Sequence, residues 1–382
     1  MPHVYAMRIH ADTSRGELDC PDEIRSTISC CLKATRSEQP TPLSIDKCMA
    51  RVKMSRRVRC LPKLVFLALV LSFTVEGATQ QVESIPIPGS KAFPESITSS
   101  SDGELFVGRI GDGGVVRFNA RTAESTVFVQ PGAAGSRSIL GVFADEASST
   151  LWACSNDLSA LGGPATGNDI GSALKAFDLK TGDAKRSISL PGSHAFCNDI
   201  TVDAKGSVYV TDSANPTVLK LSPGAATFEV FARDSAFSPP KGGGAGLDGI
   251  AFGSDGNLYV TTYTAGELFR VEVKDGRARR VTKLTGNRHL QFPDALRRLG
   301  DNSFLLIEGS GRLDRVVIRG DAFAVTAIHD GFVTPTSVAQ IGTTAWVSEG
   351  QLAFFFDPSK RNSSPSLPFR IYAVPMRKED SK

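Results

Sequence analysis

The stretch SDGNLYVTT (254–262) decides the fold, because its pattern of a small polar turn followed by a short β-rich run recurs along the chain. Its counterparts are SDGELFVG (101–108), ASSTLWACS (147–155), AKGSVYVTD (204–212), GDNSFLLIEG (300–309) and GTTAWVSEG (342–350). The first apolar residues of successive runs lie 46, 57, 50, 46 and 41 residues apart. This loose period is close to the ~40–50 residues of a propeller blade.

Each run is followed by further short segments in which apolar and polar residues alternate, such as TVLKLS and TFEVFA after the third run. Alternation with period two, together with β-branched and aromatic residues, predicts strands. Four antiparallel strands per unit, repeated six times, close into a ring that leaves only short edges. The sequence therefore predicts an all-β, six-bladed β-propeller with four antiparallel strands per blade, and favours it over a stacked solenoid. We expect QVESIPIP (81–88) to close the last blade beside FRIYAVP (369–375).

The N-terminal part of the chain is set apart from these repeats. Residues 64–73 (LVFLALVLSF) form a short apolar run behind the basic stretch 56–63, and small residues follow. This pattern is typical of a secretory signal peptide, and the run is shorter than the ~20 residues of a membrane span. The sequence predicts a signal peptide at 54–78 and a propeller at 79–382, exported to the periplasm or the extracellular space, with no membrane anchor after cleavage. Residues 1–53 are interpreted as either an over-long start or a disordered extension.

The charge balance gives no support to a nucleic-acid partner. The chain has 43 Lys and Arg against 40 Asp and Glu, but residues 1–78 hold 12 and 8 of these, which leaves a net charge of −1 for the rest. No basic patch follows from this distribution. Nothing in the sequence indicates an oligomeric state.

Two cysteines, Cys154 and Cys197, fall within the predicted propeller. In an oxidising compartment they can pair, but sequence alone does not establish that their Cα atoms come within bonding range. We expect two separately buried thiols.

One position of the repeat carries oxygen-bearing side chains. Ten residues before the first apolar residue of each run stand, in chain order, Glu95, Gly141, Asn198, Asp248 and Asp294, and the shorter sixth turn places Thr336 at the equivalent position. The innermost strand of a blade begins at one mouth of the central channel, so these positions meet around a common axis. Three carboxylates and one amide directed at one point repel one another unless a cation lies between them.

A divalent cation held by Glu95, Asn198, Asp248 and Asp294 is therefore the predicted cofactor. Ca²⁺ is the first choice because it accepts carboxylate and carbonyl oxygens in variable number, with Mg²⁺, Mn²⁺ or Zn²⁺ as alternatives. The lack of His and Cys at these positions disfavours zinc. Asp and Asn also populate turns, where they bond their own backbone, but four such residues at one offset favour a shared site.

These residues, in this order, resemble the senescence-marker-protein/gluconolactonase/luciferin-regenerating-enzyme family, which is related to the paraoxonases. The matching stretches are FPES (93–96), FCNDITVDAKGSVYVTD (196–212), LDGIAFGSDGNLYVT (247–261) and FPDAL (292–296). The resemblance, which covers about residues 85–350, implies a propeller with a divalent metal in its channel and hydrolysis of sugar lactones or of other lactones and esters. It puts Glu95, Asp248 and Asp294 at metal positions. Asn198 takes either a substrate-contacting position or that of a metal ligand in the paraoxonases.

The implied chemistry needs a Lewis acid and a base. A cation polarises the lactone or ester carbonyl and stabilises the oxyanion formed on attack. Asp248 or Asp294 is the candidate catalytic base for the attacking water. Because a neighbouring cation lowers the basicity of a carboxylate, a weakly bound or unbound carboxylate suits that role better.

The chain departs from the family at several positions. Gluconolactonases usually have Asn where this chain has Asp248, and tend to have Arg where it has Phe196, which favours a more apolar substrate. The paraoxonase histidine of the second blade is replaced by Leu140-Gly141. The predicted substrate-binding residues are Asn198, Asp199, Phe196 and His194, although a solvated loop is the simpler place for His194.

Two functions follow from these observations. We favour a metal-dependent hydrolase of lactones or related esters. The alternative is a non-catalytic propeller that binds a small ligand or a partner protein at the channel mouth, since the fold supports both.

Overall fold

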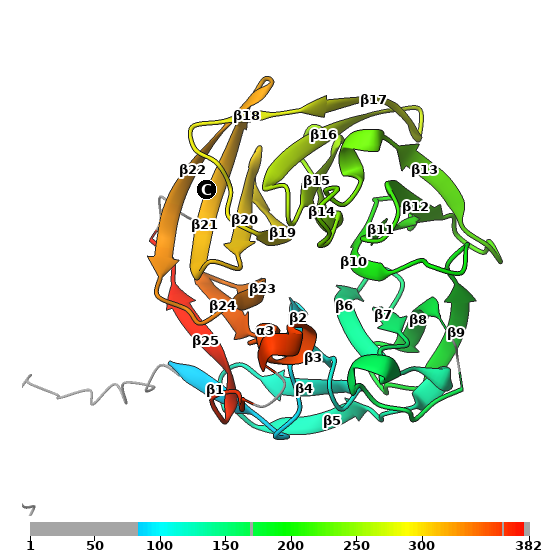
Figure 1. Ribbon diagram of the computed structural model, residues 1–382, viewed down its shortest axis with the longest axis vertical. Helices are drawn as coiled ribbons and strands as arrows, with labels where there is room; N and C mark the ends of the chain where they lie inside the picture. Colours follow the sequence, from blue (N-terminus) through cyan, green and yellow to red (C-terminus); the bar gives the residue numbers. More distant parts are fainter. Residues whose placement is uncertain (1–82, 169–170, 361–362, 378–382) are drawn as a thin grey trace, which may run out of the picture. The chain divides into compact units, whose positions relative to one another are not determined.

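The computed structural model describes residues 83–168, 171–360 and 363–377. The predicted N-terminal extension (1–53) and signal peptide (54–78) lie outside these residues. The described chain forms six antiparallel sheets arranged around a central axis, in chain order, so the predicted six-bladed propeller with four-stranded blades is confirmed (Figure 1).

The blades share one layout, in which the chain runs from the channel outward. In this order the strands are β2 (Pro94–Ser99), β3 (Glu104–Arg109), β4 (Val115–Asn119) and β5 (Ser125–Val129); β6 (Ser138–Asp145), β7 (Thr150–Asn156), β8 (Ser172–Asp178) and β9 (Ala184–Ser189); β10 (Cys197–Val202), β11 (Val208–Asp212), β12 (Thr217–Leu221) and β13 (Glu229–Arg233); β14 (Leu247–Phe252), β15 (Leu258–Thr262), β16 (Glu267–Lys274) and β17 (Arg277–Lys283); β19 (Pro293–Gly300), β20 (Ser303–Glu308), β21 (Arg312–Arg319) and β22 (Ala322–Asp330); and β23 (Pro335–Ile341), β24 (Thr344–Glu349) and β25 (Phe369–Pro375). The fifth sheet has one further short strand, β18 (Thr285–Gly286), parallel to β22.

The sixth blade is completed by the N-terminal strand β1 (Ser84–Ile87), which pairs antiparallel with β25. In this register Ser84 lies opposite Tyr372 and Ile87 opposite Phe369. Ile85 and Ile87 are fully buried, because period-two alternation turns both toward the interior. The predicted closure of the ring is confirmed, and it joins the two ends of the propeller in one sheet.

A β-bulge recurs at the start of every innermost strand. In β10 the register moves from Cys197 opposite Asp212 to Ile200 opposite Val210, so the inner strand holds one extra residue at the Asn198-Asp199 step. The same shift occurs in β2, β6, β14, β19 and β23. A bulge re-aims side chains, which is how one repeat position in each blade is set toward the channel mouth.

The hydrophobic core lies between neighbouring blades rather than at the centre of the ring. Tyr209 of β11 packs edge-to-face on Phe252 of the next blade with ring centroids 5.0 Å apart, and Tyr259 packs on Phe304 at the same distance. Aromatic pairs of this kind add about 0.5–1.5 kcal/mol beyond the area that they bury. These contacts fix the packing of one blade on the next.

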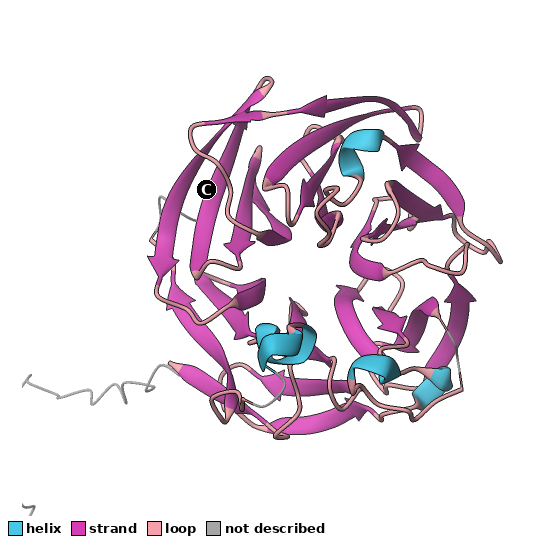
Figure 2. Ribbon diagram, in the orientation of Figure 1, coloured by secondary structure: helices cyan, strands magenta, loops and turns pink. Residues whose placement is uncertain are grey.

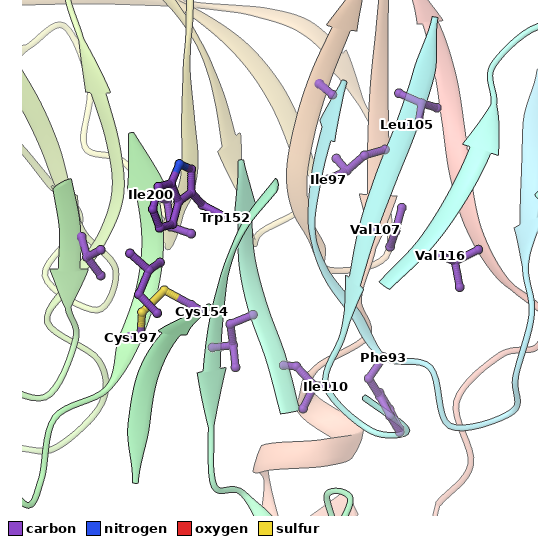
Figure 3. Packing of buried hydrophobic residues seen from close by; sticks show 14 of the residues in the cluster. Phe93, Ile97, Leu105, Val107, Ile110, Val116, Trp152, Cys154, Cys197 and Ile200 are labelled. Carbon is purple, nitrogen blue, oxygen red and sulfur yellow. A yellow bond between two sulfur atoms is a disulfide. The ribbon is translucent and has the colours of Figure 1, made fainter. Parts of the chain in front are cut away.

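Cys154 of β7 and Cys197 of β10 form a disulfide between the second and third blades, with Cα atoms 5.2 Å apart (Figure 3). Our expectation of two separate thiols is therefore wrong. The two residues are 43 positions apart, and only the packing of blade on blade brings them together. Figure 3 also shows the bridge beside Trp152 and Ile200, in the same buried cluster.

Helices are short and confined to loops (Figure 2). The helical turn α3 (Ala353–Phe356) follows β24 and lies near the inner strands β2 and β23 in Figure 1. Among the described residues, no helix has the length and apolar character needed to cross a bilayer.

Candidate functional site

The structure brings Glu95, Asn198, Asp248 and Asp294 to one cavity of about 590 Å³. Each is the second residue of an innermost strand, in β2, β10, β14 and β19 respectively. Their exposed fractions are only 5–7%. The offset found in the sequence therefore corresponds to a real convergence in space.

Hydroxyl groups of the second strands fix the positions of these side chains. Ser213 accepts a hydrogen bond from Asn198 Nδ2 at 2.8 Å and donates to the backbone oxygen of Leu247 at 2.5 Å. Thr211 donates to the backbone oxygen of Asp248 at 2.7 Å. The two bonds to backbone oxygens join the third blade to the fourth, and the Asn198–Ser213 bond lies within the third blade.

Blade two supplies no polar side chain for a steric reason. A Cβ atom on Gly141 would lie 2.1 Å from the backbone oxygen of Asn198, so no other residue fits at this position. Leu140, beside it, lines the cavity instead. At this position the backbone of the second blade therefore packs directly against the backbone of the third, and Leu140 adds an apolar side chain to the cavity.

Burial and mutual repulsion raise the pKa values of all three carboxyl groups. For Glu95 the main cause is desolvation, followed by the charges of Asp248 and Asp199. Desolvation also dominates for Asp248 and Asp294, and the next cause is the charge of Asp199 for Asp248 and the charge of Asp248 for Asp294. Without a cation, these carboxyl groups therefore keep their protons to higher pH than exposed carboxyl groups do.

One cation of the chain, Arg297, faces this acidic group from β19. Its Nη1 donates to Asp199 Oδ2 at 2.6 Å and its Nη2 donates to Asp199 Oδ1 at 3.0 Å. Nη2 also lies 3.4 Å from the hydroxyls of Ser96 and Ser337, so Arg297 connects four blades. Since Asp199 uses both oxygens on Arg297, Glu95, Asp248 and Asp294 have no ion-pair partner of their own in the described part of the chain.

A divalent cation fits the residues present. Glu95 Oε2, Asn198 Oδ1 and Asp248 Oδ1 are buried and have no hydrogen-bond partner. An unpaired buried oxygen costs about 1–3 kcal/mol, and a hard cation satisfies such oxygens in one step. Within the described ranges, however, no three His, Cys, Asp or Glu side chains are grouped as they would be around an ion.

The cavity walls are largely apolar. Apart from the acidic residues, the lining includes Leu140, Phe196, Leu352 and Phe356. Phe196, a predicted substrate contact, thus belongs to the cavity. Asp199 does not line it, because Arg297 and the backbone N–H groups of Ile200 and Ile250 take its oxygens. His194 is exposed and also lies outside the lining.

Three features of the site were missed in the sequence: Arg297, Tyr263 and the α3 segment. Arg297 is three residues after Asp294 on the same strand, and once the bulge is known, its inward direction follows. Tyr263 follows β15 directly and lines the cavity, as do Leu352, Ala353 and Phe356 of the α3 segment. The AFFF sequence of α3 is too short to show a helical period.

Comparisons with known proteins agree with this fold. No family model and no curated sequence matches the chain. Among solved structures, the Malassezia sympodialis allergen Mala s 1 is 14% identical with a TM-score of 0.59, and covers 76% of this chain and 96% of its own. The luciferin-regenerating enzyme is 9% identical with a TM-score of 0.58 (77% and 95% covered). Regucalcin from Agrobacterium tumefaciens, described as a calcium-binding protein, is 14% identical with a TM-score of 0.52 (78% and 95% covered).

The resemblance read from the sequence is thus confirmed at the level of the fold, since the luciferin-regenerating enzyme and regucalcin are among the similar structures. At identities of 9–14% this likeness defines the class of fold, a six-bladed propeller, and leaves the activity to be argued from the site.

Proposed function

We propose that the protein is an exported, divalent-metal-dependent hydrolase of lactones or related esters. The observation that carries the proposal is the set of three buried, unpartnered oxygens, Glu95 Oε2, Asn198 Oδ1 and Asp248 Oδ1, which come from three blades to one cavity. Glu95, Asn198, Asp248 and Asp294 would hold the cation, with Ca²⁺ the best match to an all-oxygen ligand set. The calcium-binding description of a structural relative supports this choice.

When bound, a cation of this kind supplies Lewis acidity at a carbonyl oxygen. The chain itself supplies the water-activating group. Asp248 and Asp294 both line the cavity, and the one held more weakly by the cation would remove the proton from the attacking water. The apolar walls around Phe196 and Leu140 restrict water and receive the body of the substrate.

Export is proposed on two grounds. The signal-like segment at 54–78 is one, and the Cys154–Cys197 disulfide is the other, because such bonds persist in oxidising compartments. A protein that matures in the periplasm or outside the cell also meets millimolar Ca²⁺, which suits a site of moderate affinity.

The alternative is a propeller that binds a small ligand without chemistry. The arrangement of the carboxylates favours this alternative, because no three His, Cys, Asp or Glu side chains of the described residues are close enough together to hold a metal ion. The cavity, lined by acidic and apolar residues, would then bind an amphiphilic ligand directly.

The test uses protein that begins near residue 78 and has been stripped with chelator. We expect Ca²⁺ to raise the melting temperature and to restore hydrolysis of a panel that contains a sugar lactone, an alkyl lactone and an aryl ester. Asp294→Asn should lose both responses while its circular dichroism spectrum is retained.

Asp321→Asn is the matched control, because Asp321 is exposed and pairs only with Arg270 at the surface. A thermal shift without turnover would support the binding alternative. If Asp294→Asn retained both the metal response and hydrolysis, the assignment of the channel site would be wrong.

A further inference from the structure

A phenol group that the metal and base assignments do not use lies beside the acidic residues. Tyr263 follows β15 at the cavity end of the fourth blade, and its ring packs against Phe292 with centroids 5.5 Å apart. Its backbone N–H donates to the oxygen of Gly246 at 2.9 Å, which fixes the start of the loop. The side chain is therefore held by packing and by its backbone.

The hydroxyl of Tyr263 has no hydrogen-bond partner among the described residues. Gly309 faces it so closely that a Cβ there would lie 3.0 Å from Tyr263 Oη. Glycine at 309 thus leaves the space around the hydroxyl open toward the cavity, which both residues line. A tyrosine whose ring is fixed and whose hydroxyl is unpaired at a cavity wall is available to a ligand.

Most other polar groups of the wall are already engaged. Ser213 donates to Leu247, Thr336 donates to the backbone oxygen of Pro94 at 3.2 Å, and Thr264 accepts from Ala245 N at 3.0 Å. Thr334 is the other wall hydroxyl without a partner. The ring of Tyr263 packs on Phe292, and Tyr263 lies within electrostatic reach of both Asp248 and Asp294.

A hydroxyl in this place acts as a hydrogen-bond donor. A phenol is protonated at neutral pH, and burial together with the nearby carboxylates raises the pKa of Tyr263 further. The acidic residues of the cavity offer only acceptors when ionised, and Asn198 Nδ2 already donates one of its two N–H groups to Ser213. The carbonyl oxygen of an ester needs a donor, and Tyr263 supplies one from the protein.

We propose that Tyr263 is a catalytic residue that donates a hydrogen bond to the substrate carbonyl oxygen. This role rests on the proposed hydrolase function. As water oxygen bonds to the carbonyl carbon, the carbonyl electron pair moves onto that oxygen, and the Tyr263 hydroxyl stabilises the charge without transferring its proton. The C–O bond of the lactone or ester then breaks, and the proton removed from water ends on the leaving alkoxide, which gives a hydroxy acid, or an acid and an alcohol.

The experiment compares Tyr263→Phe with Tyr259→Phe in the Ca²⁺-loaded protein. Both changes remove one hydroxyl from the same blade, but the Tyr259 hydroxyl bonds Asp255 at 2.8 Å at the opposite end of the β14–β15 hairpin. We expect Tyr263→Phe to lower kcat roughly 100-fold with KM changed less than about threefold, as for the loss of one oxyanion donor. Tyr259→Phe should keep kcat, and Ca²⁺ should raise the melting temperature of both variants as in the wild type.

Three results for Tyr263→Phe would overturn the proposal while the hydrolase function stands. They are a wild-type kcat, a change in KM alone, and a shift in the Ca²⁺ concentration that gives half of the rise in melting temperature. If the wild type hydrolyses nothing, the hydrolase function fails, and a six- or seven-membered lactam then tests the carbonyl contact directly. The contact predicts that the lactam raises the melting temperature of the wild type and of Tyr259→Phe but not of Tyr263→Phe. An equal rise in all three, or none, would reject it.

Discussion

Arg297 is the residue on which the electrostatics of the channel depend. It donates two hydrogen bonds to Asp199. Its positive charge also opposes the rise in the pKa of Glu95 and of Asp248 that burial and the other carboxylates cause. Glu95, Asp248 and Asp294 line the cavity and form no ion pair with another described residue. Arg297 therefore neutralises Asp199 and leaves three acidic groups at the cavity that a cation can bind.

Arg297→Met should destabilise the protein by about 3 kcal/mol, because Asp199 would be left buried without its partner. The measurement is urea unfolding in the presence of chelator. Arg270→Met is the matched control, since Arg270 pairs with the exposed Asp321 and such pairs contribute less than about 1 kcal/mol. Equal losses in the two variants would contradict the structural role given to Arg297.

At the scale of elements, the innermost strand β10 is joined to β7, the second strand of the preceding blade, where the site lies. The Cys154–Cys197 bridge ends one residue before Asn198. Asn156 adds two hydrogen bonds to Cys197, donating to its oxygen at 2.8 Å and accepting from its N–H at 3.0 Å. Strand β10 is thus held from one side by the second blade and from the other by Thr211 and Ser213, which bond to the fourth.

Replacing both cysteines, Cys154→Ala with Cys197→Ala, should lower the free energy of unfolding by about 3–4 kcal/mol, the chain-entropy value for a loop of 43 residues. Urea unfolding of the oxidised wild type and of the double variant measures this difference. Cys154→Ala alone is the control, because it breaks the same cross-link and should cost a similar amount. A double variant with an unchanged midpoint, together with two free thiols in the wild type, would reject the bridge.

At the scale of the whole molecule, the ring concentrates acidic groups at its centre, and stability should depend on pH accordingly. A carboxyl whose pKa is raised by folding holds a proton that the unfolded chain releases, so stability falls as pH rises from the ordinary value toward the raised one. The ordinary values are 3.8 for Asp248 and Asp294 and 4.5 for Glu95. Asp314, whose pKa is raised to about 6, also makes stability fall as pH rises toward that value. Asp178, whose pKa is lowered to about 2, has the opposite effect, because the stability that it contributes is lost as pH falls below about 4.

The chelated protein should therefore be less stable at pH 8 than at pH 5, and added Ca²⁺ should stabilise it more at pH 8, where protons no longer compete. Melting temperatures with chelator and with Ca²⁺, at four pH values between 5 and 8, measure both effects. Asp294→Asn removes one of the channel carboxyls and should flatten the profile. A chelated protein that is more stable at pH 8 than at pH 5 would contradict the electrostatic description of the channel.

The fold and the membership of the acidic group were predictable from the sequence because both follow from local, repeated patterns. Period-two alternation defines strands, and the turn-plus-strand unit recurs six times, so closure into a ring follows from counting. The same repetition placed Glu95, Asn198, Asp248 and Asp294 at one offset. Equivalent positions of equivalent blades meet around the axis whatever residues occupy them.

Features that depend on contact between unlike positions needed the tertiary structure. The Cys154–Cys197 bridge, the Arg297–Asp199 pair and the open hydroxyl of Tyr263 beside Gly309 each join different repeat positions, and no periodicity relates their partners. The bulge is also decided there, since it arises from pairing with the neighbouring strand and turns Asp199 away from the cavity. The sequence by itself determined a ring of blades with an acidic centre. The distances between blades decided which of those acids is neutralised by an arginine and which of them line the cavity.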